Sequence, residues 1–165
     1  MKKPRPPEDP DSEKAAYFVA LRWLSARELS EGQVRERLDR RGYTPQAICP
    51  AVERLIQNRT IDDRRTATAA ARAEAKIRRR GPRRIMGRLI AMRIDRDLAR
   101  EVVGELFGDA DEQELLEQAL DKRLRGNTAK VKDPNERRTL LGYLVRQGFS
   151  ASAASGLIRK RAREK

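Results

Sequence analysis

Apolar residues recur in three copies of one pattern along the chain. In each copy two apolar residues lie four positions apart, a third follows after five positions and a fourth after nine more. A spacing of four places the first two side chains on one helix face, and the third position falls just beyond that helix, where it would fill the turn. The copies are Val34, Leu38, Tyr43 and Val52; Ile85, Leu89, Ile94 and Val103; and Leu140, Leu144, Phe149 and Ile158. The pattern predicts a helical repeat with a buried side chain in each turn.

Capping residues stand where this pattern places helix ends. Ser30 precedes a charged stretch with helical spacing, and Gly42 follows it, where a left-handed residue most easily ends a helix. Directly after each turn residue comes a side chain that can accept the first free amide N–H groups of a helix: Thr44, Asp95 and Ser150. We therefore expect the next helix to begin at the same place in every copy.

A further helical stretch precedes each apolar pair, at residues 15–27, 63–79 and 112–125. Aromatic residues make up 4% of the chain, so the cores would consist mainly of Leu, Ile, Val and Ala, which favours helices over a β-sandwich. The predicted fold is all-α: an elongated tandem array of three three-helix, helix-turn-helix-like units. The predicted boundaries are a disordered, basic and proline-rich arm at 1–13 and units at 14–61, 62–108 and 109–165, the last with a basic tail.

The residues that most enzyme sites use are scarce. No histidine is present, and Cys49 is the single cysteine, so a disulfide framework within the chain is excluded and the thiol has no imidazole to activate it. We interpret Cys49 as a buried or partly buried thiol. Asp62 and Asp63 are too few for the oxygen cage that calcium requires, and an N-cap role is favoured. The chain is predicted to be a binding protein without catalytic activity, metal or cofactor.

The charge of the chain points to its partners. The formal net charge of +13 would draw it toward polyanions or acidic protein surfaces. No stretch approaches the roughly 20 apolar residues of a membrane span, and none follows the N-terminal lysines. We therefore expect a cytoplasmic protein without membrane contact.

Basic residues concentrate in two segments. The first spans a predicted helix end and the start of the next helix, with no acidic residue among its members: Lys76, Arg78, Arg79, Arg80, Arg83, Arg84 and Arg88. The second lies near the C-terminus: Arg159, Lys160 and Arg161. Such runs also occur as solvated helix ends that compensate the helix dipole. In a chain of this charge we interpret the first as an anion-binding surface and the second as a secondary one. Arginine binds phosphates and carboxylates alike, so DNA backbone and an acidic protein surface both remain open as targets.

Several motifs together resemble the RecX regulatory protein family. They are the sequence Ile61-Asp62-Asp63, the segment RRRGPRRI that ends at Ile85, Leu89 followed after four residues by Ile94-Asp95, and the turns at Gly42-Tyr43 and Gly148-Phe149. The resemblance runs from about Ala15 to Arg163. It implies a regulator of DNA repair and recombination in the SOS response, acting as a single copy. Such a regulator binds the RecA recombinase filament on single-stranded DNA and inhibits strand exchange, ATP hydrolysis and co-protease activity.

Two positions depart from the family's pattern. Thr66 stands where the family usually has a phenylalanine after the acidic pair, which implies different packing around the first helix of the second unit. Arg93 stands where a glycine normally ends a helix, at a cost of about 1 kcal/mol if it is left-handed. The alternative function is a helix-turn-helix transcriptional regulator that reads the major groove of duplex DNA. A preference for one duplex sequence would favour that alternative.

Overall fold

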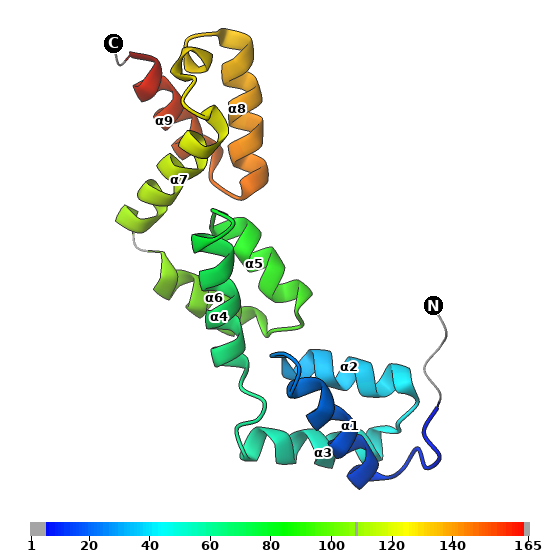
Figure 1. Cartoon of the computed structure of the whole chain (residues 1–165). Helices are drawn as coiled ribbons and strands as arrows, with labels where there is room; N and C mark the ends of the chain where they lie inside the picture. Colours follow the sequence, from blue (N-terminus) through cyan, green and yellow to red (C-terminus); the bar gives the residue numbers. More distant parts are fainter. Residues whose placement is uncertain (1–5, 108, 164–165) are drawn as a thin grey trace. The chain divides into compact units, whose positions relative to one another are not determined.

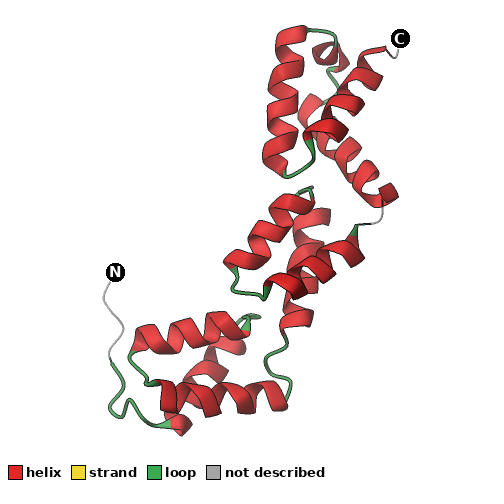
Figure 2. Cartoon of the chain, turned by 180° about the vertical axis from the view of Figure 1, so that it is seen from behind, coloured by secondary structure: helices red, strands yellow, loops and turns green. Residues whose placement is uncertain are grey.

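The computed structural model describes residues 6–107 and 109–163, and within these ranges every regular element is helical (Figures 1 and 2). The predicted all-α class is confirmed. The elements are α1 (Glu13–Leu24), α2 (Glu31–Arg41), α3 (Pro45–Gln57), α4 (Asp63–Lys76), α5 (Pro82–Ala91), α6 (Arg96–Leu106), α7 (Asp109–Leu124), the 3-10 helix η1 (Thr128–Val131), α8 (Pro134–Gln147) and α9 (Ala151–Arg163).

The helices gather into two compact units. The first consists of the chain up to Thr68 together with Ile90–Leu98, and the second consists of Ala69–Leu89 together with the chain from Ala99 onward. The segment between α3 and α7 therefore contributes to both. The division into three three-helix units with boundaries at residues 14, 62 and 109 stays a prediction.

In the first unit α1 and α2 both pack against α3 (Figure 1). Helix α1 approaches through small side chains, Ala16 and Ala20, which are fully buried. Larger apolar residues of the other two helices complete the core. The ends of α2 follow from local chemistry: Ser30 and Gln33 form a reciprocal capping box, and Gly42 takes the left-handed conformation with φ of 98°. Both ends agree with the sequence prediction.

The segment before α1 is held by contacts in its last residues. The carbonyl oxygen of Pro10 accepts from the Thr44 backbone N–H at 3.0 Å, and the Thr44 hydroxyl donates to Asp11 at 2.5 Å. Ser12 caps α1 by accepting from the Ala15 N–H. The prediction of a disordered arm is therefore wrong for residues 10–12, while residues 1–5 lie outside the described part of the chain. Thr44 also does not cap α3 with its side chain, because its hydroxyl is engaged by Asp11.

The predicted turn residues Tyr43, Ile94 and Phe149 are all buried. The predicted caps that follow the second and third of them are also confirmed. Asp95 accepts from the Asp97 and Leu98 N–H groups, and Ser150 accepts from the Ala153 N–H. The repeat therefore sets these helix starts locally, as the sequence indicated.

Val103, the fourth apolar residue in the second copy of the repeat, is less buried than the spacing predicted. Val103 is only partly buried, whereas its neighbour Val102 is 2% exposed. Helix α6 thus turns a different face inward than the spacing predicted. The equivalent Val52 and Ile158 are buried as expected.

In the second unit α8 packs against both α7 and α9. The polar segment between α7 and α8 contains η1, which contacts α8 and α9 and inserts Val131, 2% exposed, into the core. Sequence spacing gave no signal for this short element, because a single valine among polar residues has no periodicity.

The start of α2 contacts the turn that follows α5. The Ser30 hydroxyl, which is fully buried, donates to the Met92 carbonyl oxygen. Arg93 follows in the left-handed conformation, with φ of 61°. Its guanidinium pairs with Glu36 of α2 at 3.2 Å. At the other departure from the family pattern, Thr66 is buried and its hydroxyl donates to Glu28 at 3.2 Å, so a hydrogen bond replaces aromatic packing.

Candidate nucleic-acid interface

The basic segment from Lys76 to Arg88 spans two helices and the turn between them. Helix α4 ends at Lys76 and α5 begins at Pro82, so the intervening residues form the connection. Arg79 in this connection is left-handed, with φ of 53°. The connection is closed by backbone bonds from Arg79 N–H to the Ala75 carbonyl and from Arg80 N–H to the Glu74 carbonyl. These bonds satisfy carbonyl groups that the end of α4 would otherwise leave free.

Glu74, two residues before the segment, pairs with two of its arginines. Glu74 is 5% exposed, and its carboxylate accepts from Arg78 at 2.7 Å and also forms an ion pair with Arg80. A buried carboxylate requires such partners, because an unpaired charge in the interior is strongly unfavourable. Arg78 and Arg80 are thus both paired with Glu74, Arg80 through a largely covered side chain and Arg78 through an exposed one. The i,i+4 spacing of Glu74 and Arg78 was the sequence signal for the first of these pairs.

Arg84 has a tertiary role. Its guanidinium donates to the Arg146 carbonyl at 2.7 Å, at the end of α8. The Gly81 N–H donates to the Gln147 carbonyl at 2.8 Å, and the Arg83 N–H donates to the Gly148 carbonyl at 3.2 Å. The start of α5 thus supplies its free amide groups to the free carbonyl groups at the end of α8. The Arg84 side chain strengthens this docking within the second unit.

The remaining cations of the segment have side chains without a partner in the described part of the chain. Lys76, Arg83 and Arg88 are exposed and Arg79 is partly buried. No ion pair or side-chain hydrogen bond engages any of the four among the residues that the structure describes. Of the predicted anion-binding residues in this segment, these four are available for a ligand.

The two predicted basic segments meet at α7. A surface cleft of about 410 Å³ is lined by Arg79, Gln118, Asp121 and Lys122. Arg161 of α9 reaches the same aspartate, with its guanidinium 3.1 and 3.3 Å from the two carboxylate oxygens. The connection after α4, the last turns of α7 and the end of α9 therefore come together at this cleft. Gln118 and Lys122 were not among the predicted site residues, since only their position beside Arg79 singles them out.

The other two predicted residues of the C-terminal segment, Arg159 and Lys160, are exposed on α9. Within the described chain neither is engaged in an ion pair. The tail therefore separates into one cation that is held at the cleft, Arg161, and two that face solvent.

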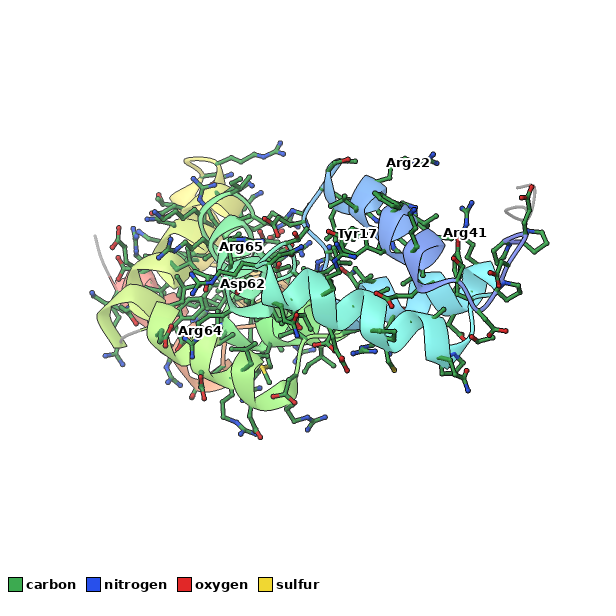
Figure 3. All side chains as sticks on the ribbon, turned by 90° about the horizontal axis from the view of Figure 1, so that it is seen from below. Tyr17, Arg22, Arg41, Asp62, Arg64 and Arg65 are labelled. Atoms are coloured by element: carbon green, nitrogen blue, oxygen red, sulfur yellow. The ribbon has the colours of Figure 1, made fainter. Side chains whose placement is uncertain are left out.

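The acidic pair at the start of α4 is structural. Asp62 accepts from the Arg65 N–H at 2.8 Å, as an N-cap does, and Asp63 accepts from the Glu31 N–H of α2 at 2.7 Å. Figure 3 shows Asp62, Arg64 and Arg65 together at this helix start. Arg65 pairs with Glu28 at 3.1 Å. Burial raises the pKa of the Asp63 carboxyl above its ordinary value, although the bond from the Glu31 N–H opposes this.

Cys49 is exposed, which corrects the prediction of a buried or partly buried thiol. Helix α3 turns Ala47, Ile48 and Ala51 toward the core, and position 49 falls on the opposite side. The thiol sulfur lies 3.6 Å from the Arg35 guanidinium.

Fold and surface together define a class: a basic protein whose described elements are all helices, with a repeated turn motif and with cations that have no partner among the described residues. No helix in the described ranges is both long enough and apolar enough to cross a membrane. A family model described as RecX, first three-helix domain, matches residues 16–55, which hold most of the first three helices.

Relatives extend the similarity over most of the chain. A protein of Syntrophotalea carbinolica named Regulatory protein RecX is 34% identical over 138 residues, which cover 83% of this chain and 90% of the relative. One of the same name from Mycobacterium avium is 27% identical, over 91% of this chain and 86% of the relative. The crystal structure of RecX from Lactobacillus salivarius has the same fold, with a TM-score of 0.79 at 22% identity over 92% of this chain and 97% of the other. The chain belongs to the RecX family of regulatory proteins.

Proposed function

We propose that this protein binds the RecA recombinase filament on single-stranded DNA and inhibits its ATPase, recombinase and co-protease activities. The observation that carries the proposal is the set of four cations in the second unit without a partner among the described residues: Lys76, Arg79, Arg83 and Arg88. A polyanionic filament is the kind of target that such cations attract. Membership of a family of regulatory proteins supports an effect through binding.

The mechanism rests on binding energy alone. The protein would shift a filament between states only to the extent that it binds one state more tightly than another. Arginine side chains can contact phosphate oxygens of DNA or carboxylates of the recombinase. Contacts that favour an inactive filament or a dissociated end would lower ATP hydrolysis and strand exchange together.

The test is RecA ATP hydrolysis on single-stranded DNA, titrated with the parent protein and a variant in which Lys76, Arg79, Arg83 and Arg88 are all replaced by glutamine. Glutamine removes the charge and keeps a long side chain with good helix propensity. The structure argues against including Arg80 or Arg84, whose contacts hold the fold. We expect the parent to inhibit at substoichiometric amounts and the variant to need a much higher concentration.

The control variant removes the same charge from the first unit. It replaces four exposed cations that have no ion-pair partner in the described chain: Lys14, Arg22, Arg27 and Arg96. Figure 3 shows one of them, Arg22, extending from α1. Inhibition by the control variant should remain close to that of the parent. Absence of inhibition by the parent, combined with tight binding to one duplex sequence, would overturn the proposal in favour of a transcriptional regulator.

A further inference from the structure

The cleft on the second unit has a composition suited to an anion. Its lining has two cations, Arg79 and Lys122, whose side chains have no ion-pair partner in the described chain. Gln118 contributes an amide group that donates one hydrogen bond to Glu114 at 3.1 Å, which leaves a second N–H. Among the described residues that line the cleft, Asp121 is the one carboxylate. The lining thus carries a net positive charge and a neutral donor.

Arg79 reaches the cleft from a backbone conformation that is unfavourable for it. A left-handed residue with a side chain is strained relative to glycine at the same position. Two backbone bonds and the Glu74–Arg80 ion pair on either side of Arg79 hold this turn in place. Strained residues that the surrounding structure fixes are frequent at binding sites. A glycine would relieve the strain but would remove a cation from the cleft.

Asp121 gives the cleft a second feature. Its carboxylate holds the Arg161 guanidinium, which is only partly exposed, at 3.1 and 3.3 Å. An anion that enters beside Arg79 and Lys122 is repelled by Asp121 and attracted by Arg161. The Asp121 carboxylate thus competes with an incoming anion for Arg161. The anion either replaces Asp121 as the partner of Arg161 or binds against the repulsion of the nearby carboxylate.

We propose that this cleft binds a backbone phosphate of single-stranded DNA. Arg79 and Lys122 supply the charge, Gln118 supplies a neutral donor, and Arg161 is a further cation that Asp121 restrains. This site rests on the proposed function and gives it a location. A phosphodiester suits the lining because its two charged oxygens can accept from donors that come from separate helices. Successive phosphates of the same strand could then reach other cations of the unit that have no partner in the described chain.

The decisive variant is Asp121→Asn, because the proposal expects a gain and not a loss. Binding to a fluorescein-labelled oligothymidylate is measured by fluorescence anisotropy at fixed ionic strength, without RecA. Removal of one nearby negative charge should tighten binding by about fivefold. Glu53→Gln, which changes the net charge equally at an exposed carboxylate of α3, should alter the Kd by less than about twofold. An Asp121→Asn protein that binds no more tightly than Glu53→Gln overturns the proposal.

Two loss variants keep the proposal testable if Asp121→Asn unfolds. Arg79→Gln and Lys122→Gln should each weaken oligothymidylate binding several-fold, and each should lower the magnitude of the salt slope by about 0.7. Lys122 is exposed and unpaired in the described structure, so its replacement leaves the fold intact. If both variants bind the free oligonucleotide as the parent does but lose affinity for the RecA filament, the cleft takes a protein carboxylate and the phosphate proposal is wrong.

The two proposals fail separately. If the parent protein inhibits RecA but the cleft variants bind oligothymidylate normally, the proposal of a phosphate site in the cleft is wrong and the proposed regulatory function stands. If the parent protein fails to inhibit RecA but the cleft variants change the affinity for oligothymidylate as expected, the proposed action on RecA is wrong and the proposed phosphate site stands. Circular dichroism melts of every variant establish that each is folded at the assay temperature.

Discussion

Gly32 and Arg93 are in such close contact that a methyl group at position 32 would lie 2.5 Å from the Arg93 Cβ and 2.8 Å from its carbonyl oxygen. Gly32 lies in the first turn of α2, and Arg93 is the left-handed residue after α5. The contact is accompanied by the bond from Ser30 to the Met92 carbonyl and by the Arg93–Glu36 ion pair. A glycine on the helix therefore accommodates an arginine in the turn.

Gly32→Ala should destabilise the first unit. Alanine is intrinsically better than glycine inside a helix by about 1 kcal/mol, so an increase in stability would be expected on a free surface. Here the new methyl group overlaps the Arg93 backbone and Cβ, and overpacking of this kind costs about 1–3 kcal/mol. We expect a net loss in the free energy of unfolding, measured by urea denaturation. A variant as stable as the parent or more stable would show that the turn moves away freely.

Arg93→Gly should have a larger stabilising effect in the Gly32→Ala background than in the parent. In the parent, relief of left-handed strain is offset by the lost ion pair with Glu36 and by the greater freedom of glycine in the unfolded chain. The net change should be within about 1 kcal/mol of zero. When position 32 already carries the added methyl group, the same substitution also removes the 2.5 Å overlap with the arginine Cβ. A double-mutant cycle measures the coupling, and additive effects would contradict a direct contact.

Gly148→Val should destabilise the second unit by more than about 2 kcal/mol, because two costs combine. Gly148 has φ of 101°, which a β-branched residue adopts only at high cost. In addition, a Cβ there would lie 2.5 Å from the Arg84 backbone nitrogen and 2.6 Å from the Arg84 Cβ. Gly156→Ala is the control, because no atom of the described chain outside its own helix turn lies within 4 Å of the added methyl group in α9. Thermal melts should show a lower Tm for the valine variant and an unchanged or higher Tm for the control.

The sequence predicted those parts of the fold that depend on local chemistry. Helix starts after Ser30, Asp95 and Ser150 are set by side chains that accept amide hydrogens nearby, and Gly42 ends a helix through its own conformational freedom. Such features are determined within a few residues. Thr44 failed as a cap because Asp11, distant in sequence, takes its hydroxyl. A tertiary competitor of this kind leaves no signal in the local pattern.

The candidate site could be predicted only as a region. Net charge and the density of arginine located the segment between positions 76 and 88, but not which of its cations are available. Glu74 occupies Arg80, and the carbonyl of Arg146 occupies Arg84. Arg79 and Asp121 lie far apart in sequence, and they line one cleft only because the fold of the second unit brings the last turns of α7 near the connection after α4. Spacing along the chain does not reveal such a meeting.

The stability of Asp63→Asn relative to the parent should depend on pH. Burial raises the pKa of Asp63 in the folded chain above its value in the unfolded chain. The folded state then holds the proton more strongly, so this group contributes stability that is fully present below the unfolded pKa and is lost as pH rises through the folded pKa. The asparagine side chain of the variant does not titrate and can still accept from the Glu31 N–H.

The difference in Tm between Asp63→Asn and the parent should therefore shift in favour of the parent as pH is lowered from 7 to about 3. Melts of both proteins across this range test it, with Glu53→Gln as a variant at an exposed carboxylate in the same unit. A shift in the opposite direction would mean that the Glu31 N–H bond outweighs burial, so that the folded chain stabilises the charged carboxylate.

Oligothymidylate binding should weaken steeply with salt, and the steepness should report how many cations touch phosphates. For single strands the logarithm of the binding constant falls linearly with the logarithm of salt concentration, by about 0.7 for each phosphate neutralised. If Lys76, Arg79, Arg83 and Arg88 all make such contacts, replacing the four with glutamine should lower the magnitude of the slope by roughly 3.

The first-unit variant of Lys14, Arg22, Arg27 and Arg96 carries the same net charge, so a long-range effect of charge alone would change both slopes alike. Since exposed charges act over about 10 Å at 0.1 M salt, only direct contact separates the two variants as the ionic strength rises. Equal slopes for the two variants would mean that the second-unit cations attract DNA without touching its backbone.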